Sequence, residues 1–260
     1  MKIAFIGDVV GRSGRRAVAE LVPQIRDAHG IDLFIANAEN SAGGFGINTK
    51  SIAELEQAGV RFFTTGNHVW DKHDGVGLLD NRNNIVRPAN YPSPAPGRGA
   101  AVVPDTDGRV AVINVQGRVF MPPIDCPFRS VDYHIDQLPD SVKILLVDVH
   151  AEATSEKIAM GWYLDGRASL VLGTHTHVPT SDQRILPGGT GYVTDVGMTG
   201  SYDAILGVEK GAVIGRFLNA RPTRFVVGKK DVRCDFVVAE VDENTGKTTH
   251  LEHLQLTLED

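Results

Sequence analysis

Short apolar runs alternate with segments of helical periodicity along the first two thirds of the chain. Five of these runs are strand-like and span residues 2–6, 33–36, 61–65, 142–147 and 168–172. Each of them is followed by a cluster of polar residues. Most are separated by segments whose apolar side chains recur at the spacing of one helical face, at residues 15–28, 51–58 and 156–164. This alternation predicts an α/β fold with parallel strands joined by right-handed crossovers.

The polar clusters after the five runs contain carboxylates, amides and imidazoles. Parallel strands present their carboxyl ends at one edge of a sheet, where ligands bind, so we expect the clusters to meet in one site. A helix cap or a turn is the alternative for any single cluster, because Asp and Asn are favoured there. The candidate site residues are Asp8, Glu39, Asn40, Asn67, His68, His150, His175 and His177.

The segments around residues 87–99 and 197–224 lack a regular apolar pattern. The first is rich in proline and glycine and is typical of an extended loop, and strand-like runs follow it at 100–103 and 110–115. The second, from residue 197 to about 224, is expected to be irregular.

The C-terminal part of the chain predicts a β-hairpin. Residues 232–241 and 248–258 flank the turn 242–246, and apolar residues alternate with polar ones in the second arm, which predicts one buried face. We therefore expect mixed strands flanked by helices, with a second sheet that packs against the first.

Composition narrows the class of protein. The chain has 260 residues and a formal net charge of −6, which argues against broad electrostatic binding of nucleic acid. A small anionic substrate stays compatible with this charge, because bound metal cations invert the local field. The two cysteines, Cys126 and Cys234, lie far apart and indicate a reducing compartment without a disulfide framework. No apolar run is long enough for a signal peptide or a membrane span, so we expect a cytoplasmic protein.

The inventory of candidate ligands favours two metal ions. His175 and His177 leave one strand end two residues apart, which suits a transition metal, although a His-Thr-His pair alone is equally compatible with a surface loop. The other ligands are two carboxylates, two amides and one more imidazole, too many for one structural zinc. Such a set suits two metals about 3.5–4 Å apart that share a bridging carboxylate. Mixed nitrogen and oxygen ligation favours iron, manganese or zinc over magnesium.

The order of these motifs resembles the calcineurin-like metallophosphoesterase superfamily over residues 2 to about 200. The motifs are Gly7-Asp8-Val9-Val10-Gly11, Asn37-Ala38-Glu39-Asn40, Gly66-Asn67-His68, an isolated His150, and Gly173-Thr174-His175-Thr176-His177. Each motif is weak alone, and the order makes the resemblance specific.

Two departures narrow the resemblance. Val10 stands where the superfamily usually has a histidine ligand, and Glu39 stands where it usually has a bridging aspartate. Together with segments 67–71, 148–157 and 173–180, these departures resemble the YmdB-like bacterial branch, whose members hydrolyse 2′,3′-cyclic nucleotides. This match extends along nearly the whole chain.

The resemblance implies a fold and a set of ligands. The fold is a four-layer α/β/β/α sandwich that spans residues 1–260 as one domain, with the hairpin at about 232–258 completing the second sheet. Iron is the expected metal, with manganese or zinc as alternatives. One metal would take Asp8, Glu39, Asn40 and His177, with Asn40 in place of the absent histidine, and the other would take Glu39, Asn67, His150 and His175.

The implied reaction is hydrolysis of a phosphodiester by a hydroxide that bridges the two metals. His68 is the candidate general acid for the leaving alkoxide, because histidine has a suitable pKa. Its alternative role is to orient the bridging hydroxide. Asp148, two residues before His150 on the same predicted strand, is either a partner that orients His150 or a strand-end carboxylate.

Three other functions are compatible with parts of this pattern. A phosphomonoesterase or protein phosphatase could use the same site, and a regulatory module could bind the metals without catalysis. A dinucleotide-binding turn at Gly7–Gly14 has the wrong glycine spacing and leaves the late histidines unexplained. The expected partner is a small anionic nucleotide, with RNA ends as a further candidate. We expect no membrane association and no stable nucleic-acid binding, and a homo-oligomer is compatible with the sequence.

Overall fold

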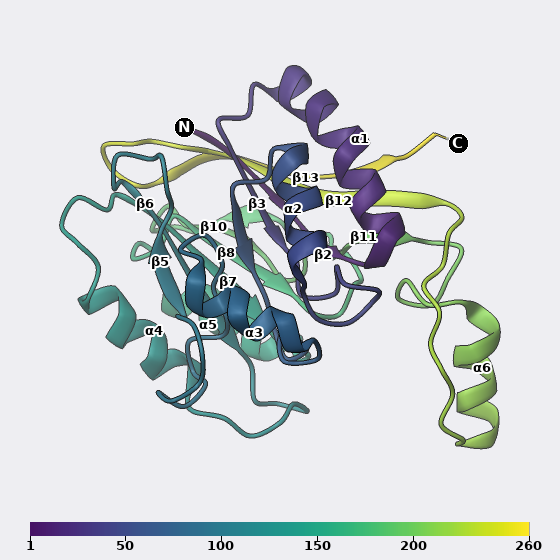
Figure 1. Ribbon diagram of the computed structural model, residues 1–260. Helices are drawn as coiled ribbons and strands as arrows, with labels where there is room; N and C mark the ends of the chain where they lie inside the picture. The colour runs from purple at the N-terminus through teal and green to yellow at the C-terminus, as the bar shows by residue number, and fades with distance from the viewer. Residues whose placement is uncertain (260) are drawn as a thin grey trace.

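Two β-sheets packed face to face form the centre of the protein, as the computed structural model shows (Figure 1). The structure describes residues 1–259. The seven-stranded sheet contains β1 (Lys2–Ile6), β2 (Asp8–Val9), β3 (Leu33–Asn37), β4 (Phe62–Thr64), β11 (Met198–Ser201), β12 (Val232–Val241) and β13 (Thr248–Thr257). Its order is β2-β11-β12-β1-β3-β4, and β13 pairs with β12.

The six-stranded sheet is built mainly from the middle of the chain. It contains β5 (Ala100–Val102), β6 (Val110–Gln116), β7 (Ile144–His150), β8 (Leu170–Thr174), β9 (Arg184–Ile185) and β10 (Gly191–Val193). Its order is β5-β6-β7-β8-β10-β9, and the four central strands run parallel.

Helices cover the outer face of each sheet and complete the four layers. The helices α1 (Gly11–His29), α2 (Thr49–Ala58) and α3 (His73–Asn81) pack on the seven-stranded sheet, and α4 (Pro127–Asp136) and α5 (Thr154–Tyr163) pack on the other. The alternation of side chains along β1 shows how the layers are held. Ala4 and Ile6 face the helices, whereas Ile3 and Phe5 face the second sheet. The predicted four-layer sandwich is therefore confirmed.

The five strand-like runs are divided between the two sheets. β1, β3 and β4 are parallel neighbours in the seven-stranded sheet, whereas β7 and β8 lie in the other. The expectation that one parallel sheet gathers all the clusters is thus too simple: the carboxyl ends of two facing sheets meet. The hairpin of β12 and β13 is present, and β12 pairs antiparallel with β1.

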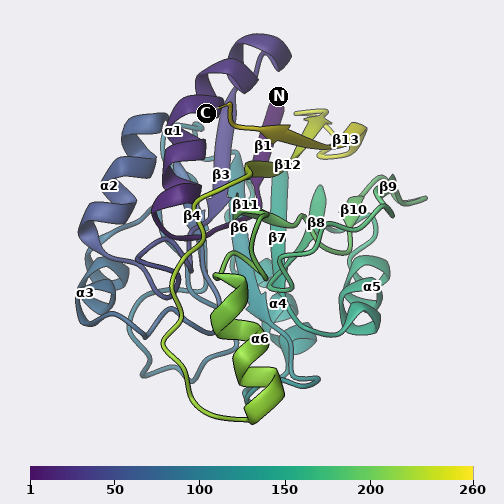
Figure 2. The same cartoon turned by 90° about the vertical axis from the view of Figure 1, so that its right-hand side faces the viewer.

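The expectation that residues 197–224 are irregular is wrong. β11 occupies Met198–Ser201, and the helix α6 occupies Lys210–Asn219. Both lack the usual signals: β11 is a buried strand of only four residues, and α6 buries only Val213, so it has no apolar stripe. Figure 1 shows α6 apart from the sheets, and in Figure 2, viewed from that side, it lies in front of them. Among the helices of residues 1–259, none is long and apolar enough to cross a bilayer.

Candidate metal centre

Four donor atoms converge where β3, β4 and the six-stranded sheet end. The Nε2 atom of His150 lies 3.2 Å from Glu39 Oε1, 3.1 Å from Asn67 Oδ1 and 3.1 Å from His175 Nδ1. Suitable ligand atoms of Glu39, His150 and His175 all lie within 4.8 Å of one another, the arrangement a metal ion needs. Both Glu39 and His150 are buried.

A second group of donors lies beside the first. His177 Nε2 is 2.9 Å from Asn40 Nδ2 and 3.9 Å from Asp8 Oδ1. The other oxygen of Asp8 accepts a hydrogen bond from the backbone nitrogen of His175 at 3.1 Å, which joins the two groups. The structure therefore brings together all seven side chains expected as ligands.

Two oxygen atoms of this second group have no hydrogen-bond partner in the described part of the chain. Asp8 Oδ1 and Asn40 Oδ1 are buried, and nothing within residues 1–259 donates a hydrogen bond to either. Leaving a buried polar atom unpaired is costly, and such atoms are rare in folded proteins. Both are hard oxygen donors next to an imidazole nitrogen, so a bound cation fits this position well.

The turn after β8 holds its two histidines in an uncommon backbone conformation. His175 has φ 98° and His177 has φ 63°, in the left-handed region that residues with a Cβ rarely adopt. Asp195 stabilises the turn by accepting hydrogen bonds from the backbone and hydroxyl of Thr176 at 3.2 and 2.7 Å. The ammonium of Lys157 pairs with the same carboxylate in the protein interior. Strain held by the surrounding structure is typical of functional sites.

A hydrogen-bonded chain orients His150. Thr174 donates its hydroxyl hydrogen to Asp148 at 2.7 Å, so it accepts a hydrogen bond from Nδ1 of His150 at 2.9 Å. This places a hydrogen on Nδ1 and turns Nε2 toward Glu39 and Asn67. Asp148 therefore acts on His150 through Thr174, and Asn37 holds the other oxygen of Asp148 at 3.1 Å.

The side chains of the first group of donors shift one another's pKa. Burial alone would raise the pKa of Glu39, but the neighbouring His150 lowers it to about 2. Burial alone would lower the pKa of His150, but Glu39 raises it to about 9. For His175, burial and the charge on His150 act together and lower the pKa to about 3. Without a cation, Glu39 and His150 thus form a buried ion pair, and His175 is neutral.

The comparisons with known proteins agree with this geometry. The family model described as "YmdB-like protein" matches residues 4–254. The chain belongs to this family. It is 47% identical to the 2′,3′-cyclic-nucleotide 2′-phosphodiesterase of Bacillus subtilis, over 98% of this chain and 96% of that protein. It is 33% identical to a putative phosphatase/phosphodiesterase of Mycoplasma pneumoniae, over 100% of this chain and 94% of the relative.

Two solved structures share the YmdB-like architecture. A hypothetical protein from Thermus thermophilus superposes with a TM-score of 0.92 at 43% identity, over 99% of both chains. A novel phosphatase from Mycoplasma pneumoniae superposes with a TM-score of 0.93 at 33% identity, over 99% of this chain and 93% of that one. The metallophosphoesterase-type fold is therefore shown, and the Glu39-His150-His175 cluster is compatible with a metal site in it.

His68 lies next to this YmdB-like centre but points to other partners. Its backbone nitrogen donates to Glu39 Oε2 at 3.3 Å, while its ring nitrogen Nδ1 lies 2.9 Å from Asp71. Its ring packs edge-to-face with that of Phe45, with centroids 4.9 Å apart. The side chain stays 32% exposed, so it is open to a ligand.

Several neighbours of the centre had no expected role. Glu152 lies 3.3 Å from His175 Nε2, and Asp71, Thr174, Lys157 and Asp195 make the contacts described above. Some of them fall inside the motifs described from the sequence, and Asp195 follows a separate strand. The sequence therefore offered only a weak signal for their contacts with the centre. Their contacts depend on how the two sheets face each other.

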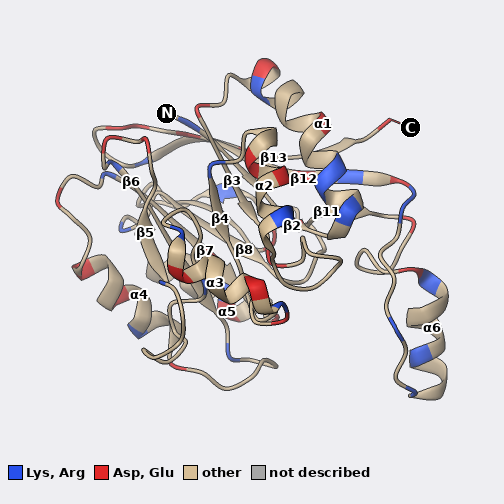
Figure 3. Ribbon diagram, in the orientation of Figure 1, with Lys and Arg blue, Asp and Glu red and all other residues tan. Residues whose placement is uncertain are grey.

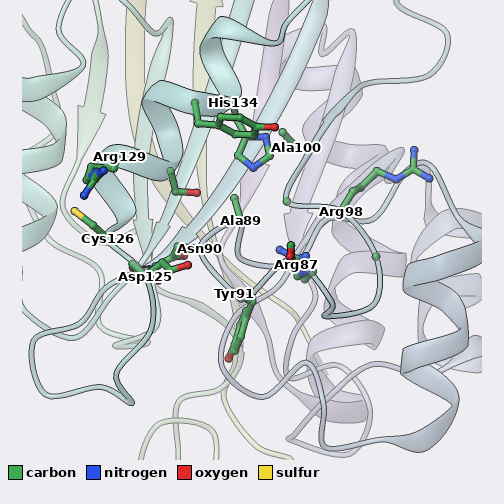
Figure 4. Close-up of a pocket in the computed structure, with 15 residues that line it drawn as sticks. Arg87, Ala89, Asn90, Tyr91, Arg98, Ala100, Asp125, Cys126, Arg129 and His134 are labelled. Atoms are coloured by element: carbon green, nitrogen blue, oxygen red, sulfur yellow. Dashed lines mark hydrogen bonds between the residues drawn. The ribbon is translucent and has the colours of Figure 1, made fainter.

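The loop 87–99 lines a cavity of about 710 Å³ (Figure 4). Arg87 organises the loop by donating to the carbonyl oxygens of Pro88, Ala95 and Pro96. Tyr91 lies at the opposite end of the labelled group from His134, and its hydroxyl donates to Gln116 at 3.1 Å. None of the candidate ligands lines this cavity, so the candidate metal centre and the cavity are different places.

Proposed function

We propose that the protein is a dinuclear-metal phosphodiesterase that hydrolyses small phosphodiesters, with 2′,3′-cyclic nucleotides as substrates. The observation that carries the proposal is the meeting of seven donor side chains around two unpaired buried oxygens, Asp8 Oδ1 and Asn40 Oδ1. The name of the Bacillus subtilis relative supports the substrate class. The proposed hydrolase would act in a reducing compartment, the cytoplasm, since Cys126 and Cys234 are both free.

The residues divide between two proposed metal positions. Iron is the proposed metal, with manganese or zinc as alternatives, because the donors mix imidazole and oxygen. When bound, the two metals supply an activated water and neutralise charge on the phosphoryl oxygens. Glu39 would be a ligand shared by both positions; Asp8, Asn40 and His177 would complete one position, and Asn67, His150 and His175 would complete the other.

His68 supplies the proton that the leaving oxygen needs. The contact between its Nδ1 and Asp71 fixes the ring, which leaves Nε2 as the atom that can face a substrate. The water oxygen bonds to phosphorus as the P–O2′ bond breaks, His68 gives its proton to the departing O2′, and the product carries a 3′-phosphate.

A phosphomonoesterase is the second candidate function, because the Mycoplasma pneumoniae relative is named a putative phosphatase/phosphodiesterase. The same ligands serve both reactions. What distinguishes them is the leaving group and the number of ester bonds on phosphorus, so substrate competition decides between them.

A turnover screen tests the proposal. The metal-loaded protein is assayed with 2′,3′-cyclic AMP, 3′,5′-cyclic AMP, 3′-AMP and p-nitrophenyl phosphate, beside a chelated control. We expect the 2′,3′-cyclic nucleotide to have the highest kcat/KM, with 3′-AMP as the product and no turnover after chelation. Preferential turnover of the monoesters would support the second candidate, and turnover that survives metal removal would contradict both.

A further inference from the structure

The segment 210–230 differs in charge from the rest of the molecule. It contains six lysines and arginines and no carboxylate, within a chain whose formal net charge is −6. We call this segment the basic arm. It comprises α6 and the irregular return of the chain toward β12, and Figure 3 shows its blue residues on the part that projects from the sheets. A local run of cations in an acidic protein indicates an anionic partner.

Most of these cations are not used within the protein. Arg221, Arg224, Lys229 and Lys230 are exposed, and within residues 1–259 no carboxylate pairs with them. Lys210 is the exception, since it pairs with Asp203. Four exposed and uncompensated cations on one projecting segment leave charge available for a ligand.

Aromatic side chains accompany the cations. The guanidinium of Arg216 lies over the ring of Phe225, 5.3 Å from its centroid. Phe217, on the outer part of α6, is 84% exposed. Cations interleaved with rings are the features that proteins use to hold single-stranded nucleic acid, because the cations track the phosphates while bases stack on the rings.

The base of the arm touches the candidate metal centre. Phe225 stacks on Phe45, with centroids 6.4 Å apart and ring planes 25° apart, and Phe45 in turn contacts His68. Just before the arm, the carbonyl oxygen of Leu206 accepts a hydrogen bond from Nδ1 of His177 at 3.2 Å. A row of rings therefore leads from the centre outward to Arg216.

We infer that the basic arm binds the chain of a single-stranded RNA whose terminal 2′,3′-cyclic phosphate lies at the metal centre. This inference rests on the proposed function and extends it from a free nucleotide to an RNA end. The terminal base stacks on the row of Phe45 and Phe225, and the preceding phosphates pair with the exposed arginines. The reaction is unchanged: water adds to phosphorus, the P–O2′ bond breaks, and O2′ takes a proton from His68.

A second copy of the chain is the rival occupant, because Phe217 and Leu218 are both more than four-fifths exposed. Two features favour RNA over a second copy. The acidic surface of another copy could attract the arm, since the rest of the chain carries twelve more acidic than basic residues, but this attraction would not explain why rings lie beside the metal centre. Symmetric pairing of two arms would also bring six cations against six others.

The test compares two variants that remove equal charge. Arg221→Gln with Arg224→Gln alters the arm, and Lys143→Gln with Lys247→Gln alters the opposite edge of the sheets, where β7 begins and the hairpin turns. Each is assayed with 2′,3′-cyclic AMP and with an RNA of about ten nucleotides that ends in a 2′,3′-cyclic phosphate. Binding of the same RNA with a 3′-phosphate is followed by fluorescence anisotropy over a range of salt concentrations, and mass by sedimentation.

We expect the arm variant to bind the RNA about 10-fold more weakly, with the slope of log affinity against log salt smaller by about 1.4, or about 0.7 per lost phosphate contact. Its kcat/KM for the cyclic mononucleotide should change less than about 2-fold, and the control variant should match the parent. Equal RNA binding by arm variant and parent, an equal loss on both substrates, or a changed mass would overturn the inference. Failure of the parent on the mononucleotide, with salt-dependent RNA binding intact, would instead count against the proposed function.

Discussion

The ring of His68 contacts a carboxylate and a phenylalanine. The rings of the other candidate histidines lie instead against candidate metal ligands. Asp71 lies against Nδ1, and the ring of Phe45 packs edge-to-face with that of His68. A ring fixed in this way and one third exposed is suited to give a proton to a substrate.

His68→Ala should therefore keep both metals and lower turnover by roughly 10²–10⁴-fold. The loss should shrink with bis(p-nitrophenyl) phosphate, whose leaving group needs no proton. Asp71→Asn should show a smaller loss in the same direction, and His73→Ala, an exposed neighbour, should match the parent. Loss of metal from His68→Ala, measured by elemental analysis, would contradict the assignment.

Asn40 offers a second test at the scale of one side chain. Its amide lies 2.9 Å from His177, and its oxygen is buried without a partner. Asn40→His should retain more metal than Asn40→Leu, because an imidazole can replace the lost donor whereas leucine cannot. Isothermal titration with manganese measures the difference. Equal affinity of both variants and the parent would show that Asn40 is not a ligand.

Metal affinity should also depend on pH through His150. Its pKa is raised to about 9 by Glu39, so at neutral pH the metal-free ring is protonated and must release a proton before it binds a cation. Affinity should therefore rise about 10-fold per pH unit between pH 7 and 9 and level off above that range. His175 adds no such dependence here, because its pKa is about 3. An affinity that is constant from pH 7 to 9 would contradict this account.

The places of the candidate ligands were predictable because each follows a strand end, where chain direction alone places a side chain at a sheet edge. The residues that contact these candidate ligands were not predictable. Thr174 and Asp148 share a line of contacts with His150 only because β7 and β8 pair in a particular register. Asp195 reaches Thr176 across a turn. Such contacts depend on tertiary packing and leave little periodicity in the sequence.

At the scale of elements, the turns after strands matter as much as the strands. Gly66 follows β4, and a Cβ at this position would lie 2.1 Å from Glu39 Oε2 and 2.2 Å from His150 Nε2. The absence of a side chain therefore lets β3, β4 and β7 bring their donors together.

Gly66→Ala should consequently disrupt the centre, with loss of at least one metal equivalent and most of the turnover. Gly77→Ala is the matched control, since Gly77 is exposed in α3 and a Cβ there meets nothing within 4 Å. The control should bind metal normally and gain about 0.5–1 kcal/mol in unfolding free energy. Normal metal content in Gly66→Ala would show that the site tolerates displacement of Glu39 and His150.

The long helix α1, which has a buried face, was predictable, whereas α6, which has none, was not. The helix α1 buries apolar residues at regular spacing, and its periodicity is visible in residues 15–28. By contrast, α6 buries only Val213. Hydrophobic periodicity reports the packing of an element, so an element that projects from the core leaves almost no trace.

At the scale of the whole molecule, the two sheets act as two halves of one site. Glu39 comes from the seven-stranded sheet, whereas His150 and His175 come from the other. The net charge of −6 suggested no stable contact with nucleic acid, but a net value hides the local surplus of cations in residues 210–230. Charge distribution, and not total charge, distinguishes these cases.

The central claim is that Glu39 joins two metal ions across the two sheets. Metal content of purified Glu39→Ala, measured by mass spectrometry beside the parent and Glu152→Ala, tests it most directly. Glu152 also reaches His175 but is half exposed, so its loss should leave both metals in place. We predict two equivalents in the parent and in Glu152→Ala, and less than one in Glu39→Ala with turnover abolished. Two full equivalents in Glu39→Ala would contradict a bridging carboxylate and the dinuclear centre built on it.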